Sequence, residues 1–520
     1  MKRIKFLALF LVIFCTAISC TGSKQSNDGI IRMRLPGDPP TLDWAMATDN
    51  VSKEVINPIQ EGLVIQGKGV EVQPAMAKSW EISKDGTLYT FTLRDNAVWS
   101  DGVPVVAQHF VDGWERLLNP KTGSEYAYFL FDVQGAEDYQ SGKIQDFSKV
   151  GVKAVDDQTL QVKLSYPASY WIHVPTFWVT YPVRKDLIKK FGDKWASAEN
   201  MVSNGPYSLK VWQRESRILL EKNPRYYDLE SIKNSPEQIE FRTVKESSIA
   251  VTLFNNGKLD IVRDLPPIQL PTLSKKEEFV SSNQFRGYYV AFNIKDSKVK
   301  DPRIRKAIAL AIDRTQMEKA LHGAVSATKS WIPKGMLAYD ESIGISFNPE
   351  EAKKLWSEIK NPPKAIEMWF DSGERNKIVG ENIQSQVKKV LGIEIKIQVQ
   401  EWKVYLRTLV NDPPTFWRLG WGADYPDPDN FMNLFTCSSG NNNTRFCSKS
   451  YDAAIKEAAG SQDEGKRVEL YTKAQKQLLE EEVAIVPLFN EKNMHLVSQR
   501  VEGFYVNEMG DFSFKRITLK

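Results

Sequence analysis

Hydrophobic and polar positions along the chain follow two different periods, and the two alternate irregularly. Apolar residues at every second position predict half-buried strands in three segments, at 88–94, 156–167 and 393–402. Apolar residues at every third or fourth position predict amphipathic helices at 107–118, 301–314 and 467–481. Shorter strand patterns occupy 483–488 and the C-terminal residues 504–520. This mixture predicts α/β lobes, and 520 residues are too many for a single core.

The segments 301–314 and 393–402 give the most detailed predictions. Asp301 suits the N-cap of a helix and Pro302 suits its first turn. One apolar stripe follows, at Ile304, Ala307, Ile308, Ala311 and Ile312. In the second segment the expected core face is Ile393, Ile395, Ile397 and Val399. Trp402 has the opposite parity, so it either faces a cleft or water, or covers another element.

The N-terminus has the pattern of an export signal. Basic residues at positions 2, 3 and 5 precede the apolar run Phe6–Ile18, which is too short to span a bilayer core of about 30 Å. Residues 1–19 are therefore predicted to be a signal peptide. Ala17–Cys20 resembles a bacterial lipobox, which predicts a lipid on Cys20, although ordinary cleavage is the alternative. Residues 20–29 then read as a flexible, lipid-anchored tether.

Charge and composition exclude some partners. The formal net charge is +4, and removal of the signal takes away three basic residues and leaves +1. Such a chain has neither the basic surface expected for nucleic-acid binding nor a polybasic membrane patch. Aromatic residues make up 11% of the chain, which favours contact surfaces.

Two cysteines remain after the signal and the lipobox. Cys437 and Cys447 flank the loop SSGNNNTRF. In an exported protein this spacing predicts a disulfide, and two free thiols are the alternative. A metal site is disfavoured because no His or further Cys accompanies the pair.

Signatures of catalysis are absent from the sequence, which has no HExxH, CxxC, GxSxG, Walker or GxGxxG motif. Neither an enzyme activity nor a cofactor nor a metal is therefore predicted. The segment WGADYPDP, Trp421–Pro428, instead places acids among aromatic rings, with Arg418 shortly before it. Asp424 and Arg418 would suit the two charges of a zwitterion. Equally, Asp424 could cap a turn and Arg418 could pair with a surface acid.

Longer stretches resemble, in the same order, the landmarks of the peptide-binding proteins of bacterial ABC importers. They are Glu61–Pro120, SNGPYSL, LEKNPRYYD, FNNGKLDI, Asp301–Arg314, QEWKVYL and WGADYPDP. The resemblance is strongest to the oligopeptide-binding branch and covers essentially the whole mature chain.

The resemblance implies an α/β fold of the periplasmic-binding-protein type, with two lobes, a hinged ligand cleft and a subdomain inserted in the first lobe. The implied division is lobe I at 30–60, 184–285 and 490–520, the inserted subdomain at 61–183, and lobe II at 286–489.

The resemblance also implies binding roles. Asp424 would pair with the α-ammonium group of a peptide, and the backbone around Trp421, Gly422 and Ala423 would pair with the peptide in antiparallel fashion. The stretch Thr48, Asp49 and Asn50 would supply the parallel partner. Trp402 would line a side-chain pocket, Arg418 would meet a C-terminal carboxylate, and Tyr126 and Tyr128 would be the aromatic contribution of the insert.

Two positions depart from the pattern of the relatives. Trp44 stands where a Pro is usual. Gly422 stands where many relatives have a Cys that is bonded within lobe II. That bond is therefore expected to have moved to Cys437 and Cys447, or to be absent.

The function predicted from this resemblance is a monomeric, lipid-anchored receptor in the periplasm or at the cell surface. It would capture short peptides and deliver them to an ABC permease in the membrane, without nucleic acid as a partner. Three alternatives stay open at this point. They are a receptor of the same fold for nickel, haem, an opine or an oligosaccharide, a surface interaction protein, and a peptidase.

Overall fold

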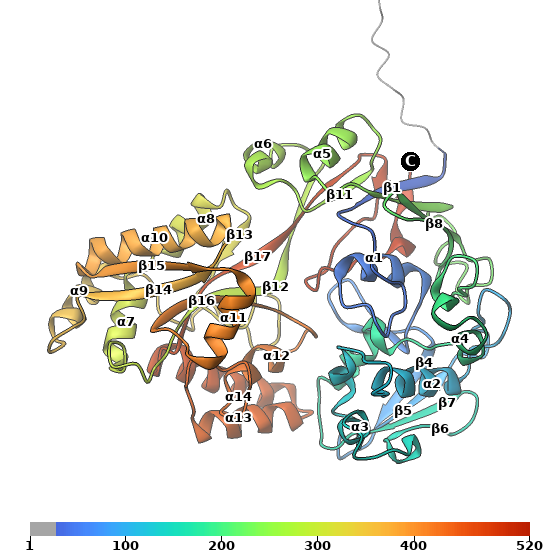
Figure 1. Ribbon diagram of the computed structural model, residues 1–520, viewed down its shortest axis with the longest axis horizontal. Coiled ribbons are helices and arrows are strands. Elements are labelled where there is room, and N and C mark those ends of the chain that lie inside the picture. Colours follow the sequence, from blue (N-terminus) through green and yellow to red (C-terminus); the bar gives the residue numbers. More distant parts are fainter. Residues whose placement is uncertain (1–27) are drawn as a thin grey trace, which may run out of the picture.

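Two lobes stand side by side in the computed structural model, which describes residues 28–520 (Figure 1). The predicted signal peptide, Cys20 and most of the predicted tether lie outside the described residues. The lobes are connected by two long antiparallel strands, β12 (Phe279–Phe292) and β17 (Ile485–Val497). Their pairing shifts register between Asn283 and Gly287 and again between Tyr288 and Tyr289.

A single hydrogen-bonded sheet runs through both lobes. Its strand order is β15-β14-β16-β12-β17-β11-β1-β10-β9-β8, and β13 pairs with β17. Besides the two connecting strands, its members are β1 (Ile30–Leu35), β8 (Tyr207–Gln213), β9 (Arg217–Lys222), β10 (Gln238–Thr243), β11 (Ile261–Arg263), β13 (Val325–Ala327), β14 (Ala365–Asp371), β15 (Glu394–Gln400) and β16 (Phe416–Gly422).

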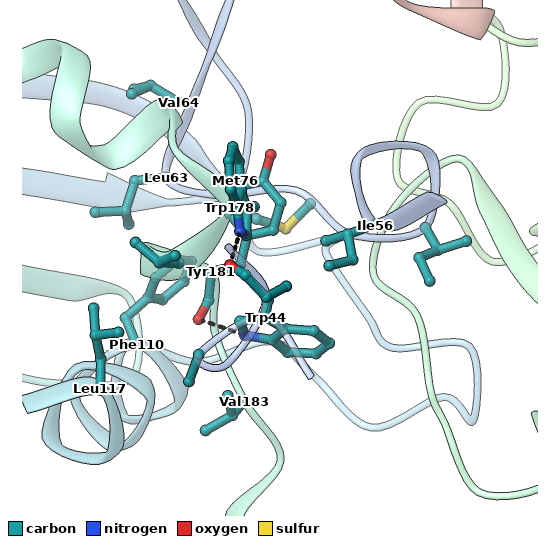
Figure 2. Close-up of a cluster of buried hydrophobic side chains, with 14 of the residues drawn as sticks. Trp44, Ile56, Leu63, Val64, Met76, Phe110, Leu117, Trp178, Tyr181 and Val183 are labelled. Atoms are coloured by element: carbon teal, nitrogen blue, oxygen red, sulfur yellow. Dashed lines mark hydrogen bonds between the residues drawn. The ribbon is translucent and has the colours of Figure 1, made fainter. Parts of the chain in front are cut away.

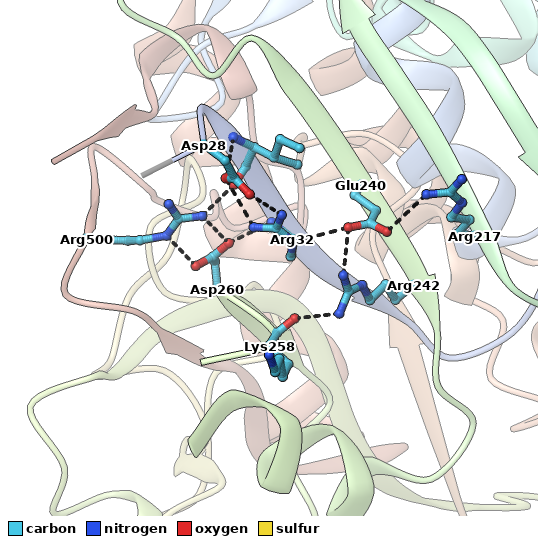
Figure 3. Close-up of polar contacts among 9 residues, drawn as sticks. Asp28, Arg32, Arg217, Glu240, Arg242, Lys258, Asp260 and Arg500 are labelled. Carbon is cyan, nitrogen blue, oxygen red and sulfur yellow. Dashed lines mark hydrogen bonds and ion pairs between the residues drawn. The ribbon is translucent and has the colours of Figure 1, made fainter. Parts of the chain in front are cut away.

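The first lobe is built around β1, which pairs in parallel with both β10 and β11. Its helices are α1 (Asn50–Ile59), α4 (Lys185–Phe191), α5 (Ser247–Asn255) and α6 (Leu270–Leu273), and a small sheet joins β18 (Val501–Glu502) to β19 (Thr518–Leu519). Arg500 binds Asp260 through Nε at 2.7 Å and Nη2 at 2.9 Å, while the Arg32 amide donates to Asp260 Oδ2 at 2.7 Å (Figure 3). This network ties the first strand to the C-terminal segment.

A separate four-stranded sheet forms the insert, in the order β4-β5-β7-β6. Its strands are β4 (Ala77–Ile82), β5 (Leu88–Leu93), β6 (Val152–Ala154) and β7 (Thr159–Lys163), accompanied by the pair β2 (Val64–Gln66) and β3 (Val72–Pro74) and by helices α2 (Ala107–Leu118) and α3 (Ala136–Gln140). One hydrophobic core joins this insert to the first lobe. Trp44, Ile56, Phe110 and Trp178 belong to it (Figure 2).

The second lobe carries a hydrophobic core on each face of its part of the sheet. Its helices are α7 (Pro302–Leu310), α8 (Arg314–Ala320), α9 (Pro349–Ser357), α10 (Glu374–Leu391), α11 (Trp402–Asn411), α12 (Asp429–Met432), α13 (Lys449–Gly460) and α14 (Glu464–Lys476). Alternate residues of β16 enter opposite cores, with Phe416 on one face and Trp417 on the other. The mixed α/β fold with two lobes is as predicted.

Several predicted elements coincide with the observed ones. The helix predicted at 107–118 is α2, and the strand predicted at 88–94 is β5, one residue shorter. Asp301 caps α7 by accepting the amide of Arg303, and Pro302 is the first residue of that helix. The helix predicted at 467–481 begins earlier, at Glu464, and changes to a π-helical turn at 477–481.

The prediction for 393–402 is wrong at its C-terminal end. The strand β15 ends at Gln400, and Trp402 begins α11. Val399, predicted to lie in the core, is 54% exposed, because β15 is the edge strand of the sheet and its C-terminal end is not covered by another element. Trp402 is 43% exposed, but the reason is its place at the start of a helix and not its parity along a strand.

Cys437 and Cys447 are joined by a disulfide bond across ten positions of the chain. In the chain-entropy model, closing so short a loop stabilises the folded state by about 3 kcal/mol. We therefore expect the Cys437→Ser, Cys447→Ser double variant to unfold at lower urea concentration than the unmodified protein. Equilibrium denaturation monitored by tryptophan fluorescence measures this difference. Equal midpoints for the two proteins would show that the loop is held by its other contacts.

Candidate functional site

The turn after β16 is held in place by one side chain. Asn430, in α12, accepts hydrogen bonds at Oδ1 from Trp421 Nε1 at 2.7 Å and from the Asp424 amide at 3.2 Å. The Asp429 amide in turn donates to Asp427 Oδ1 at 2.9 Å, which fixes the start of the helix. The segment WGADYPDP is therefore a rigid turn that presents Asp424 beyond the end of a central strand.

Asp424 is a half-buried carboxylate without a cationic partner of its own. Within residues 28–520 no basic side chain forms an ion pair with it. Burial raises the pKa of Asp424, whereas a hydrogen bond from Asn430 and the charge of Arg286 act in the opposite direction. A partly desolvated carboxylate of this kind is stabilised by an incoming cation, such as an ammonium group.

Two tyrosines of the insert lie close to Asp424. Burial raises the pKa of the Tyr126 and Tyr128 hydroxyls, and the negative charge of Asp424 raises both further. The Tyr126 hydroxyl donates to the backbone oxygen of Thr48 at 3.0 Å. The two rings meet edge to face, with centroids 5.9 Å apart. The structure thus brings Thr48, Tyr126, Tyr128 and Asp424 together, although they come from three distant parts of the chain.

Hydrogen bonds from two buried tryptophans hold the loop that contains Thr48 in place. Trp44 is buried and donates through Nε1 to the Tyr181 oxygen at 3.2 Å, while Trp178 donates to the Ala47 oxygen at 3.0 Å (Figure 2). Trp44 is therefore an internal support of this loop, in the position where relatives are expected to have Pro.

Asp49 and Asn50 belong to the beginning of α1. Asp49 caps this helix, because its carboxylate accepts the amide of Ser52 at 2.9 Å and the hydroxyl of Ser52 at 2.6 Å. The side chain of Asp49 therefore already has a structural role. Thr48 and Asn50 are exposed, and the backbone of Thr48 is the part that contacts Tyr126.

One edge of β16 lacks a neighbouring strand over its second half. All of β16 pairs with β12, but on the other side β14 pairs only with Phe416 and Trp417 in the described part of the chain. The Ala423 amide donates to the Phe285 oxygen, toward β12. Because backbone groups alternate between the two edges of a strand, those of Gly420 and Gly422 point to the open edge. This edge can accept an added strand.

Arg418 and Trp402 lie together on the second lobe, on either side of Tyr405. The Tyr405 hydroxyl contacts the Arg418 backbone oxygen at 2.5 Å, and its ring lies 6.3 Å from that of Trp402. Arg418 Nη2 lies 2.9 Å from Asp371 Oδ1, so the charge that was expected to meet a carboxylate is already paired. Its Nε is buried and has no hydrogen-bond partner among the described residues.

The insert and the second lobe also touch directly, away from the connecting strands. The Tyr170 and Tyr425 rings stack with centroids 4.8 Å apart, at 12° between planes. Ser169 donates to the Ala459 oxygen through its amide at 2.9 Å and its hydroxyl at 3.1 Å. The Tyr425 hydroxyl donates to Asp429 Oδ2 at 2.9 Å, which places a buried carboxyl group behind this contact.

Asp429 should make the stability of the protein depend on pH. Burial, and then the charge of Asp427, raise the pKa of Asp429 to about 7, whereas an unfolded Asp titrates at about 3.9. Between about pH 4 and 7 the folded state therefore binds more protons, so the free energy of unfolding contributed by this group falls as pH rises through that window. We expect this decrease to be smaller in Asp429→Asn, as measured by urea denaturation at several pH values.

The comparison must be made between the two proteins, because other groups act in the opposite sense. Burial lowers the pKa of His173 to about 4, so this group favours folding as pH rises from about 4 to 6.5. His173 is the same in both proteins, so the difference between their curves isolates Asp429. Parallel curves would show that Asp429 is ionised in the folded state across this range.

Three side chains at the site were not identified from the sequence. Asn430 and Asp371 are ordinary polar residues whose partners, Trp421 and Arg418, become evident only in the fold. Arg286 is directly opposite Gly422 in the pairing of β12 with β16. The one signal for it is Gly422 itself, because a missing side chain in a strand often marks the close approach of another group.

Neither a metal-binding cluster nor a membrane-spanning helix is present within residues 28–520. No cluster of three or more His, Cys, Asp or Glu side chains is arranged to bind a metal ion there. The helices in this range are all too short or too polar to cross a bilayer.

Comparison with known proteins now identifies the family. Residues 71–443 match the model of the bacterial extracellular solute-binding proteins, family 5 middle region. The dipeptide-binding protein DppE of Bacillus subtilis is 31% identical over 547 residues, which cover 99% of each chain.

Solved structures agree. The unliganded open form of MppA, a periplasmic murein tripeptide-binding protein, superimposes with a TM-score of 0.87 at 28% identity, covering 96% of this chain and 99% of that one. Haemophilus influenzae OppA in complex with the peptide RPPGFSPFR gives 0.72 at 29% identity, covering 95% and 100%. The match over more than half of the chain and the full-length relative agree, and the chain belongs to the family 5 extracellular solute-binding proteins, as a peptide-binding protein of the ABC importer type.

Proposed function

We propose that this protein captures short peptides by their main chain and α-ammonium group and delivers them to an ABC permease. The observation that carries this proposal is Asp424, a half-buried carboxylate without an ionic partner in the described chain, close to two tyrosines of the insert. An ammonium group at this position would make a charge-assisted hydrogen bond in a partly desolvated place.

The open edge of β16 supplies the second part of the proposal. A peptide that begins at Asp424 and runs antiparallel to β16 would pair with the backbone around Gly422 and Ala423, and the loop at Thr48–Asn50 would lie on its other side. Main-chain hydrogen bonds do not depend on sequence, so many peptides can be accepted. Trp402 would line a side-chain pocket, and Arg418, which already lies 2.9 Å from Asp371, would share its charge with the C-terminal carboxylate of a short peptide.

The arrangement of the lobes fits an empty receptor. The chain is more similar to the unliganded open form of MppA than to peptide-bound OppA. Closure would bend β12 and β17 and bring the second lobe over the peptide. We propose the bounds 30–60, 184–285 and 490–520 for lobe I, 61–183 for the insert and 286–489 for lobe II.

Anchoring is a further part of the proposal. A lipid on Cys20 and the tether at 20–29 would hold the monomeric receptor at the membrane that contains its permease. In that arrangement a released peptide stays close to the transporter. Labelling of cells with a radioactive or alkyne-bearing fatty acid would test the anchor, and Cys20→Ser should remove both the label and the membrane association.

The experiment that tests the function is mass spectrometry of whatever the purified mature protein releases when it is gently denatured. We expect a mixture of short peptides of varied sequence, and saturable binding of a synthetic tripeptide by the emptied protein. Release of one non-peptide compound, together with no binding of any peptide from a short library, would instead favour a receptor for another solute.

A further inference from the structure

An arginine occupies the space beside the proposed ammonium site. Arg286, in β12, is the direct partner of Gly422 in β16. A Cβ atom added to Gly422 would lie 3.1 Å from Arg286 Nη2 and 3.2 Å from its Cζ and Nε. The guanidinium group therefore lies across the backbone of Gly422. It reaches from β12 over β16 toward the open edge of that strand, and it can do so because residue 422 has no side chain.

Arg286 and Asp424 are on the same side of the sheet. Leu419, Trp421 and Ala423 pack against the core that contains Trp417, on one face of the sheet. Gly422 and Asp424, which alternate with them, point the opposite way, and residues directly opposite in an antiparallel pair share a face. Arg286 is also close enough for its charge to lower the pKa of Asp424. A negative and a positive group therefore share this face at the end of β16 without forming an ion pair.

Arg286 forms no ion pair with a described residue, although its charge acts on Asp424. Arg418 lies 2.9 Å from Asp371, and Arg375 lies 2.8 Å from Glu491, so both of these neighbouring cations have partners. Arg286 is exposed and forms no ion pair within residues 28–520. A planar guanidinium group with free donors is suited to binding a carboxylate through two parallel hydrogen bonds.

The proposed direction of the peptide sets which of its residues would reach Arg286. With the α-ammonium group at Asp424 and the chain antiparallel to β16, the first residue lies beside Gly422, over which the guanidinium extends. We propose that Arg286 binds the side-chain carboxylate of an N-terminal Glu or Asp, so that peptides with an acidic first residue are the preferred ligands. This inference rests on the proposed function and adds a substrate class to it.

Titration calorimetry with three peptides tests the inference. The peptides are Glu-Ala-Ala, Gln-Ala-Ala and Lys-Ala-Ala, which share their length and termini and differ in one side chain. The unmodified protein should bind Glu-Ala-Ala about tenfold or more tightly than Gln-Ala-Ala, as expected for hydrogen bonds to a charged group, and Lys-Ala-Ala most weakly. In Arg286→Gln the ratio of the Glu and Gln affinities should fall to about one, and Arg286→Lys should retain part of it.

A matched control is Arg375→Gln, which removes another exposed arginine of the same lobe and should leave the ratio unchanged. Equal affinities for the Glu and Gln peptides in the unmodified protein would overturn the inference. So would an Arg286→Gln variant that changes all three affinities by the same factor, because Arg286 would then act only through Asp424. If Gln-Ala-Ala, Glu-Ala-Ala and Lys-Ala-Ala all fail to bind, the proposed function fails and this inference falls with it.

Discussion

Asp424→Asn should weaken the binding of a tripeptide with a free N-terminus by about 30-fold or more. Removal of one member of a desolvated charge pair costs about 2–5 kcal/mol, and about 1.4 kcal/mol corresponds to a factor of ten. The cost arises because the peptide ammonium would be buried beside the Tyr126 and Tyr128 rings without a carboxylate opposite it. Titration calorimetry on the emptied protein measures the change.

Two controls separate this effect from a general loss of structure. The unmodified protein should bind an N-acetylated tripeptide weakly, and Asp424→Asn should bind the free and acetylated forms with similar affinity. Asp412→Asn removes the same charge from an exposed position of the second lobe and should leave affinity unchanged. Undiminished binding of the free peptide by Asp424→Asn would exclude Asp424 as the ammonium site.

Arg467→Met should destabilise the protein by about 3–5 kcal/mol at neutral pH, as expected when one member of a buried ion pair is removed. Arg467 Nη2 binds both oxygens of Asp427, at 2.7 and 2.6 Å, and Asp429 lies in the same cluster. Without the arginine, two buried carboxyl groups would be left without a cation. Urea denaturation measures the free energy of unfolding.

The pH dependence of this loss identifies its cause. Burial raises the pKa of Asp429 to about 7, so this group carries less negative charge at pH 5 than at pH 8, and the difference between Arg467→Met and the unmodified protein should be smaller at pH 5. The double variant Arg467→Met, Asp427→Asn should recover part of the lost stability, because it leaves one acid fewer. A loss that is equal at both pH values would show that packing of the long side chain, and not its charge, is what matters.

The sequence predicted elements best where local chemistry and packing agree. Asp301 and Pro302 favour the start of α7 by themselves, and the apolar stripe after them is buried in the core. The stripe nevertheless predicts too long a helix, since α7 ends at Leu310, and Ala311 and Ile312 are buried beyond it. Periodicity reports which residues face the core, but it does not report where the backbone turns.

The failure at Trp402 has a related cause. The apolar alternation ends at Val399, because Glu401 occupies the next core position, and the edge strand β15 stops at Gln400. The predicted strand extends past this break to Trp402. The resemblance predicts which residues belong to the site, but it does not predict which of their charged side chains are already paired within the protein. Whether Arg418 is paired or free depends on Asp371, which is brought to it by the parallel pairing of β14 with β16. No local pattern contains that information.

The topology of the sheet has a consequence for the order in which the protein completes its structure during synthesis. The fully buried residues of the two second-lobe cores all lie between 285 and 489, whereas those of the first-lobe core combine residues 31–261 with Val497, Val501, Phe514 and Ile517. Strand β11 acquires its outer partner only when Val497 is available. The lobe whose residues are made first is therefore the last to close, and its unpaired edge must be protected from other strands until the end of the chain arrives.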